Sequence, residues 1–197
     1  MKLYWCPQTR AMRVVWLLEE AGVPYERVHI DIRDPQAKAN AAFRAASPMG
    51  KVPALEDGST RLWDSGAICA YVADQYPASG LAPGIGHPQR GAYLQWLMFT
   101  NACLEPAMSE KVGGAPANSA RSGWGSWDLM LGTLRNGLER GPWILGERFS
   151  AADILLGASC YFMRKFKMID DEPVIFAYAD RCVARPAFKR AQALEPA

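Results

Sequence analysis

The spacing of apolar and polar residues divides the first 76 positions into short alternating strands and helices. Apolar residues cluster in a first strand and then recur at helical spacing until Gly22 and Pro24 end the helix. Val28, Ile30 and Ile32 alternate with polar residues, as strand residues with one buried face do. The predicted strands are 3–5, 28–32, 52–55 and 60–63, and the predicted helices are 11–21, 37–46 and 65–76. The predicted order is therefore βαβαββα.

After position 86 the pattern is helical throughout, apart from a loop-like stretch at 113–125. Residues 78–86 are rich in Gly and Pro and predict a linker. Ser150 and Asp153 form a capping box, which stabilises the helix after it by about 1 kcal/mol and indicates no catalytic role. The predicted helices are 88–112, 124–140, 151–166 and 174–185, with a last short one from Ala187. We predict an α/β domain at 1–77, a linker at 78–86 and an all-α C-terminal domain at 87–197.

Charge and hydropathy argue against nucleic-acid-binding, membrane and secreted proteins. The chain carries 22 Lys and Arg against 20 Asp and Glu, a formal net charge of +2, without a block of five like charges. Nucleic acid and anionic membranes are therefore not expected as partners. The N-terminus lacks the pattern of a signal peptide and no apolar run approaches the length of a membrane span, so we expect a cytoplasmic protein.

The five cysteines are odd in number and form no C-x-x-C pair, which argues against a disulfide framework and against a zinc site or other metal. Four of them lie in apolar helical stretches and are predicted to be small core residues: Cys69, Cys103, Cys160 and Cys182. Cys6 differs, because it precedes Pro7 where the first strand gives way to the first helix, a position at which thiols are often exposed and reactive.

Two dipeptides predict a site for a small peptide. A cis bond between Val52 and Pro53 would turn the Val52 backbone outward, where an extended peptide can pair with it. Ser65 opens a helix, where N–H groups and a hydroxyl favour a ligand carboxylate, and the Asp64 carboxylate favours an ammonium group. Each pair also has an ordinary structural explanation, as an edge-strand proline and a helix N-cap. Glutathione has the backbone, carboxylate and amine that this combination would bind.

These residues resemble the glutathione-binding half of cytosolic glutathione S-transferases, of bacterial type. The strand-turn-helix at 3–18 and the stretch 149–154 extend the resemblance over nearly the whole chain. It implies a thioredoxin-like N-terminal domain, an all-α C-terminal domain, a homodimer, a cis bond before Pro53, and glutathione as co-substrate in detoxification. The residues that it places at glutathione are Lys51, Val52, Pro53, Asp64 and Ser65.

The resemblance places the group that meets the glutathione sulfur just after the first strand. Thr9 falls where theta-, delta- and zeta-like members carry their catalytic hydroxyl, and Cys6 falls where omega-like members carry a cysteine. Arg10 stands where a beta-like cysteine would fall, so the beta-type turn is not expected, although its charge can support a thiolate. We favour Thr9, whose hydroxyl and the helix N-terminus would stabilise the thiolate that attacks an electrophilic carbon.

The second substrate is less defined. The resemblance implies a pocket lined by Trp5 from the first strand and by early residues of the second domain, namely Met98, Thr100, Asn101, Cys103 and Leu104. The chain ends soon after Leu194, so an open site for a small hydrophobic electrophile is expected. Two alternatives remain: a glutathione-dependent thiol/disulfide oxidoreductase that uses Cys6 on a disulfide substrate, and a non-catalytic binding module of the same fold.

Overall fold

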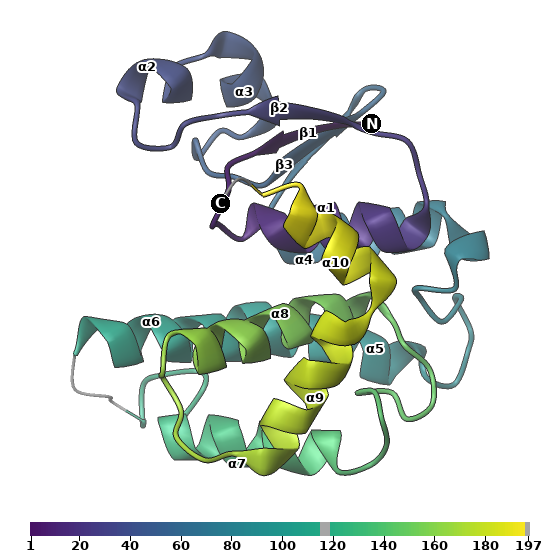
Figure 1. The fold of residues 1–197 in the computed structure, drawn as a ribbon, viewed down its shortest axis with the longest axis vertical. Helices are drawn as coiled ribbons and strands as arrows, with labels where there is room; N and C mark the ends of the chain where they lie inside the picture. The colour runs from purple at the N-terminus through teal and green to yellow at the C-terminus, as the bar shows by residue number, and fades with distance from the viewer. Residues whose placement is uncertain (115–118, 196–197) are drawn as a thin grey trace. The chain divides into compact units, whose positions relative to one another are not determined.

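The structure is a computed structural model that describes residues 1–114 and 119–195 (Figure 1). It divides into two compact units. Met1–Ser79 and the residues from Pro186 onward form the first unit, and Gly80–Arg185 form the second. The predicted loop at 113–125 lies partly outside the described residues.

The first unit contains a four-stranded sheet in the order β2-β1-β3-β4. β1 pairs in parallel with β2 and antiparallel with β3, which pairs antiparallel with β4. The strands are β1 (Lys2–Trp5), β2 (Glu26–His29), β3 (Ala54–Asp57) and β4 (Thr60–Trp63). The helices are α1 (Ala11–Ala21), α2 (Pro35–Lys38), α3 (Ala41–Ala46) and α4 (Ser65–Gln75), followed by the 3-10 turn η1 (Pro77–Ser79). The predicted thioredoxin-like fold is confirmed. The predicted order βαβαββα holds except that the predicted helix 37–46 is divided into α2 and α3, because Asn40 begins a new helix by accepting the Phe43 N–H.

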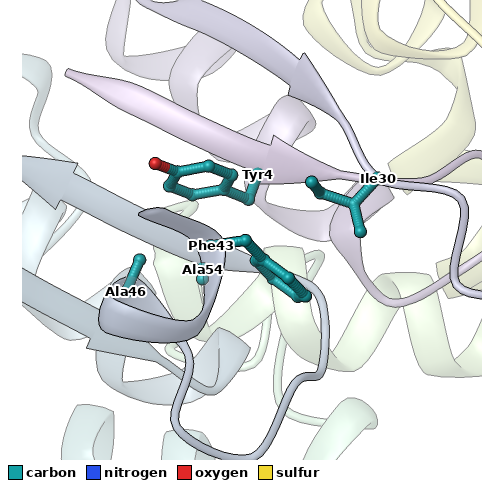
Figure 2. Close-up of a cluster of buried hydrophobic side chains, with 5 residues drawn as sticks. All are labelled: Tyr4, Ile30, Phe43, Ala46 and Ala54. Atoms are coloured by element: carbon teal, nitrogen blue, oxygen red, sulfur yellow. The ribbon is translucent and has the colours of Figure 1, made fainter. Parts of the chain in front are cut away.

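Helices cover both faces of this sheet, with α2 and α3 on one side and α1 and α4 on the other (Figure 1). Figure 2 shows the core on the α3 side, where the Tyr4 and Phe43 rings lie 5.6 Å apart between their centroids. Ile30, Ala46 and Ala54 complete this buried cluster. Val52, directly before Pro53, packs against the same cluster, so the start of β3 is held by the core of the unit.

β2 ends at His29, short of the predicted strand 28–32. Among the described residues β2 pairs only with β1, whose last residue, Trp5, is opposite His29. The Ile30 N–H still bonds the Trp5 carbonyl at 2.8 Å, and the chain then turns as the Asp31 side chain accepts the Arg33 N–H. The alternation of apolar and polar residues continues to Ile32 in the sequence, but the strand ends at His29 because β1 ends at Trp5.

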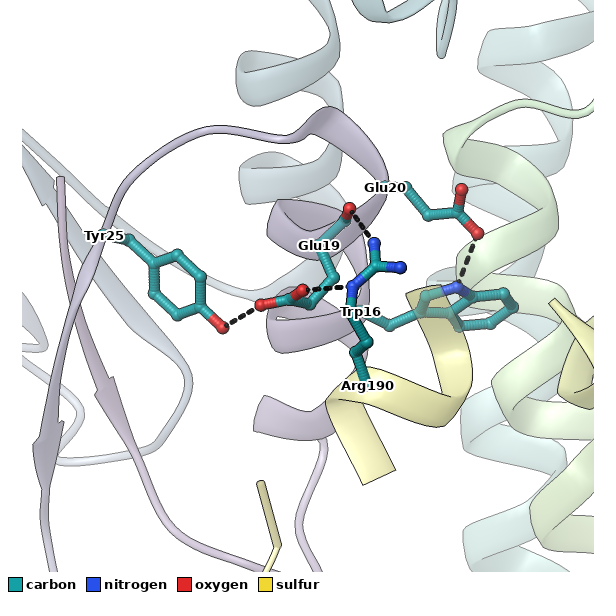
Figure 3. Close-up of polar contacts among 5 residues, drawn as sticks. All are labelled: Trp16, Glu19, Glu20, Tyr25 and Arg190. Carbon is teal, nitrogen blue, oxygen red and sulfur yellow. Dashed lines mark hydrogen bonds and ion pairs between the residues drawn. The ribbon is translucent and has the colours of Figure 1, made fainter. Parts of the chain in front are cut away.

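The last helix, α10 (Pro186–Ala193), packs against α1 within the first unit. The Trp16 and Phe188 rings meet edge to face, 5.0 Å apart. Figure 3 shows the polar contacts beside them: Arg190 Nε donates to Glu19 Oε2 at 2.8 Å, and the Tyr25 hydroxyl donates to Glu19 Oε1 at 3.0 Å. The predicted boundaries assigned this helix to the C-terminal domain, whereas its packing groups it with the N-terminal sheet.

The second unit is helical, and its central helix α8 is buried along most of its length. Its first turn is fixed by Asp153, whose Oδ2 accepts the Ser150 N–H at 2.9 Å and whose Oδ1 accepts the Tyr178 hydroxyl at 2.8 Å. The predicted capping box is therefore present. The helices are α5 (Arg90–Phe99), the π-helix η2 (Thr100–Leu104), α6 (Glu105–Gly113), α7 (Trp127–Leu138), α8 (Ala151–Lys165) and α9 (Pro173–Ala184).

The predicted helix 88–112 is interrupted by η2. Pro106 follows η2 in the first turn of α6 and has no N–H to donate to a carbonyl four residues back. The Glu105 N–H instead reaches back five residues to the Thr100 carbonyl, the π-helical spacing. The helix therefore continues past Pro106 with one widened turn, which a pattern of apolar residues does not reveal.

Burial of the cysteines follows the prediction only in part. Cys69, Cys160 and Cys182 are buried as expected, whereas Cys103 is half-buried. Burial raises the pKa of the Cys69 thiol, which keeps it protonated. Cys6, expected at an exposed position, is only 4% exposed. None of the described helices is both long and apolar enough to cross a membrane.

Candidate glutathione site

The register of the sheet brings three chain segments to one edge. Tyr4 pairs with Ala54 across β1 and β3, and Ala54 pairs with Trp63 across β3 and β4. One step beyond these pairs, the end of β1, Pro53 and Asp64 are neighbours at the same sheet edge. Three segments therefore lie together at this edge: residues 6–10 between β1 and α1, which we call the first-strand turn, the loop before β3, and the start of α4. A single site built from these segments, as predicted from the sequence, requires this arrangement.

The loop before β3 is shaped by a buried serine. The Ser47 hydroxyl donates to the Lys51 carbonyl at 2.8 Å and accepts the Lys51 N–H at 3.0 Å, and Ser47 is fully buried. The bond between Val52 and Pro53 is cis, as expected. Within the described part of the chain, no hydrogen bond occupies the Val52 N–H or C=O. Sequence reasoning missed Ser47, although a serine before a Pro-Met-Gly loop is a recognisable turn signal.

Asp64 caps α4 in an unusual backbone conformation. Its Oδ1 accepts the N–H groups of Gly66 at 2.9 Å and Ala67 at 3.3 Å. Its φ of 82° and ψ of 124° lie where residues other than glycine are rare. Such strain, on the order of 1–3 kcal/mol, is often found at binding sites. Asp64 is therefore an N-cap, as its ordinary structural explanation requires. Both helix N–H groups donate to Oδ1 and neither donates to Oδ2.

Ser65 follows as the first residue of α4 and is 5% exposed. Among the described residues, no hydrogen bond is made by its hydroxyl. The hydroxyl therefore retains both its donor and its acceptor capacity at a helix N-terminus, where a carboxylate is favoured. Lys51, also predicted at this site, is exposed beside the same loop.

The first-strand turn places Cys6, Thr9 and Arg10 between β1 and α1. The Thr9 hydroxyl donates to the Cys6 carbonyl at 2.7 Å and accepts the Ala11 N–H at 3.2 Å, so it closes the turn and pairs with the first N–H group of α1. Gln8 has a left-handed φ of 57°, which asparagine, aspartate and glycine adopt more readily than glutamine. No sequence signal identified this conformation.

The residues predicted for a second substrate differ in accessibility. Trp5, at the end of β1, is 7% exposed, with the Arg27 guanidinium 4.8 Å from its ring centroid and the His29 ring 6.0 Å away. In the second unit, Met98 is 49% exposed, and Asn101 and Cys103 are half-buried. Thr100 and Leu104 are fully buried, and the Thr100 hydroxyl donates to the Trp96 carbonyl at 3.1 Å.

Comparisons with known proteins agree with this geometry. The sequence model "Glutathione S-transferase, N-terminal domain" matches residues 1–74. The bacterial transferase BphK, solved as a ternary complex, is 31% identical with a TM-score of 0.83, over 99% of both chains. A sphingomonad glutathione S-transferase complexed with glutathione is 32% identical with a TM-score of 0.81, over 99% of this chain and 98% of that one.

A more distant relative carries a different activity. YfcG of Escherichia coli, a disulfide-bond oxidoreductase, is 28% identical over 77% of this chain and 75% of its own length. The family thus includes proteins described by either chemistry that the first-strand turn suggests. With the near-complete coverage of the two solved transferases, the thioredoxin-like sheet and the cis bond before β3, the chain belongs to the cytosolic glutathione S-transferase family.

Proposed function

We propose that the protein is a glutathione transferase, which stabilises the thiolate of glutathione for attack on a small hydrophobic electrophile. The observation that carries the proposal is the convergence of the first-strand turn, the cis Val52–Pro53 bond and the Asp64–Ser65 opening of α4 at one sheet edge. The family and its glutathione-bound member support glutathione as the ligand. A role in detoxification and a cytoplasmic location belong to the same proposal.

Glutathione would lie along this edge in an extended form. Val52 would exchange backbone hydrogen bonds with the peptide, because its N–H and C=O are not used by other described residues. The γ-glutamyl carboxylate would meet Ser65 and the N-terminus of α4, and the ammonium group would meet Asp64. Lys51 would reach the glycyl carboxylate. This orientation directs the cysteinyl sulfur to the first-strand turn.

Thr9 is proposed to act on that sulfur, and its geometry sets a condition. A hydroxyl has one proton, which here points to the Cys6 carbonyl. The hydroxyl must therefore rotate when glutathione binds, while continuing to accept the Ala11 N–H. Together with Arg10 and the N-terminus of α1, it would lower the pKa of bound glutathione by about 2 units, equal to about 2.7 kcal/mol.

Conjugation kinetics test the role of Thr9. Thr9→Ala should lower the rate and raise the pKa of bound glutathione, read from thiolate absorbance against pH, whereas Thr9→Ser should keep most of the rate. Cys6→Ala serves as the control and should change little. A wild-type titration curve for Thr9→Ala would remove the hydroxyl from the mechanism. Arg10→Gln should leave most of the thiolate shift in place if the hydroxyl is the main contributor.

Disulfide reduction by Cys6 is the second candidate, favoured by its position in the same turn and by the oxidoreductase relative. The Cys6 thiolate would attack the glutathione sulfur of a mixed disulfide between glutathione and a substrate thiol, and the substrate thiolate would leave. A second glutathione, as its thiolate, would then attack the Cys6–glutathione disulfide, which releases the Cys6 thiolate and forms glutathione disulfide, so that the substrate is reduced and two glutathione molecules are oxidised. The 4% exposure of Cys6 weighs against this route. Intact-protein mass spectrometry after treatment with oxidised glutathione should detect an adduct, absent in Cys6→Ala, only if this route operates.

The remaining proposals concern binding and assembly. A non-catalytic module that had lost its glutathione site would fail to be retained on immobilised glutathione, whereas we expect retention. We also propose a homodimer, for which sedimentation velocity at micromolar concentration should give twice the mass of the 21.7 kDa chain. A monomer under those conditions would refute the dimer without affecting the proposed chemistry.

A further inference from the structure

The loop before β3 folds back onto the end of α3. The Ser47 N–H donates to the Phe43 carbonyl at 2.7 Å, and the Gly50 N–H donates to the Ser47 carbonyl at 2.8 Å. The two side-chain bonds of Ser47 to the Lys51 backbone close the same turn. Residues 47–51 are therefore held against the C-terminal end of α3 in one defined conformation.

This turn brings Gly50 against the side chain of Arg44. Phe43 and Ala46 bury one face of α3 in the core of the unit (Figure 2), whereas Arg44 is exposed. Gly50 has a left-handed φ of 63°, and a Cβ at this position would overlap Arg44 Nη1 and lie 3.5 Å from Arg44 Cζ. The guanidinium group therefore occupies the space of a side chain at position 50, directly before Lys51.

Positive charge is concentrated on this part of the chain. Residues 35–55 include Lys38, Arg44 and Lys51 but no Asp or Glu. Among the described residues, no hydrogen bond or ion pair is made by the Arg44 guanidinium or by the Lys51 ammonium group. An arginine in the last turn of a helix can stabilise that helix by its charge alone. Its place over Gly50, beside a second cation, also makes it available to a carboxylate bound along the loop.

We propose that Arg44 is a further glutathione-binding residue, which binds the glycyl carboxylate together with Lys51 and so selects ligands in which that carboxylate is free. The inference rests on the proposed glutathione site, in which Lys51 alone was assigned to this end of the peptide. A guanidinium group presents two parallel N–H groups to the two oxygens of a carboxylate, which an ammonium group does not. Gly50 contributes by its lack of a side chain, because a Cβ there would displace the guanidinium.

Two ligands isolate the glycyl carboxylate. Glutathione carries it, whereas glutathione amide has a neutral glycinamide at the same end and the same peptide elsewhere. Isothermal titration calorimetry at low ionic strength gives both dissociation constants for the wild type and for Arg44→Gln, and the ratio of the amide constant to the glutathione constant measures the selectivity. The matched control, Arg140→Gln, makes the same substitution at an exposed arginine of the second unit.

Arg44→Gln should weaken glutathione binding about fivefold, the size of an exposed charge pair, and leave the amide within twofold of the wild type. The difference should shrink as salt is added, and Arg140→Gln should leave the ratio unchanged.

An unchanged ratio in Arg44→Gln would overturn the inference, whether both constants stay at their wild-type values or rise equally. Arg44 would then act at most as a stabilising charge at the end of α3, and glutathione binding by the wild type would leave the proposed function intact. Failure of the wild type to bind either ligand would overturn the proposed function, and this inference with it.

Discussion

Asp64 offers the sharpest test of the glutathione site, because its observed role as a helix cap and its proposed role in binding can be separated. One carboxylate oxygen accepts two N–H groups of α4, and the backbone has a positive φ. The proposed second role is to bind the ammonium group of glutathione. Asp64→Asn retains an acceptor oxygen and tolerates the backbone conformation, but it removes the charge. Asp64→Ala removes both the cap and the charge.

The two substitutions should therefore separate stability from affinity. Asp64→Ala loses a cap worth about 1 kcal/mol, which lowers Tm by about 2–4 °C. Asp64→Asn should keep most of the stability. Loss of a charge-assisted hydrogen bond, worth about 1.5–3 kcal/mol, should nevertheless raise the Kd for glutathione about 10- to 150-fold.

Thermal unfolding and isothermal titration calorimetry measure both quantities on the same samples. A glutathione analogue without the α-amino group provides the control, since Asp64→Asn should bind it nearly as well as the wild type does. If Asp64→Asn bound glutathione itself with wild-type affinity, the carboxylate would be a helix cap alone. The proposed orientation of glutathione along the sheet edge would then be wrong at its γ-glutamyl end.

Three further outcomes are expected. Ser47→Ala should lose about 1–3 kcal/mol of stability and weaken glutathione binding, because its two hydrogen bonds shape the loop before β3; unchanged affinity in calorimetry would contradict this role. Burial and the Glu19 carboxylate raise the pKa of Tyr25, so the stability that Tyr25 contributes is complete below about pH 10 and is lost as pH rises further. In thermal unfolding at alkaline pH, Tm should therefore fall less steeply with pH in Tyr25→Phe than in the wild type. An equal fall of Tm with pH in the two proteins would refute this prediction. Gly137→Ala should destabilise the protein by about 1–3 kcal/mol, because a Cβ at this position would lie 2.5 Å from ring carbons of Trp96. Gly132→Ala is the control and should not destabilise it, because a Cβ there would have nothing within 4 Å. Similar Tm values for the two variants would contradict this packing argument.

The elements of the fold were largely readable from the sequence, because their signals are local. Gly22 ends α1 in a left-handed conformation, as glycine at a helix end usually does, and the capping box begins α8. The predicted boundaries were wrong where contacts with another part of the chain determine the structure. Ile30 lies beyond β2 because β1 ends at Trp5, which is already opposite His29. Pro106 is accommodated by a π turn that depends on carbonyls earlier in the helix.

The candidate site shows the same division. The residue pairs at positions 52–53 and 64–65 were identifiable because dipeptides at a helix start or strand start have recognisable chemistry. The Thr9 hydroxyl bond to the Cys6 carbonyl, the Gln8 conformation and the hydrogen bond from the Gln8 N–H to Glu195 were not, because each depends on backbone geometry or on residues far apart in sequence. The contact between Gln8 and Glu195 joins positions separated by 187 residues.

The return of α10 to α1 has a consequence for how the protein is made. The ribosome releases the sheet and α1 long before the helix that covers Trp16, since Glu19 and its partner Arg190 are 171 residues apart. During that interval the nascent thioredoxin-like unit exposes an apolar face that a chaperone or the emerging helices must protect. A fragment that stops at Ser79 lacks α10 and would keep this apolar face exposed. To study the glutathione-binding unit alone, α10 should therefore be kept in the fragment, for example by circular permutation.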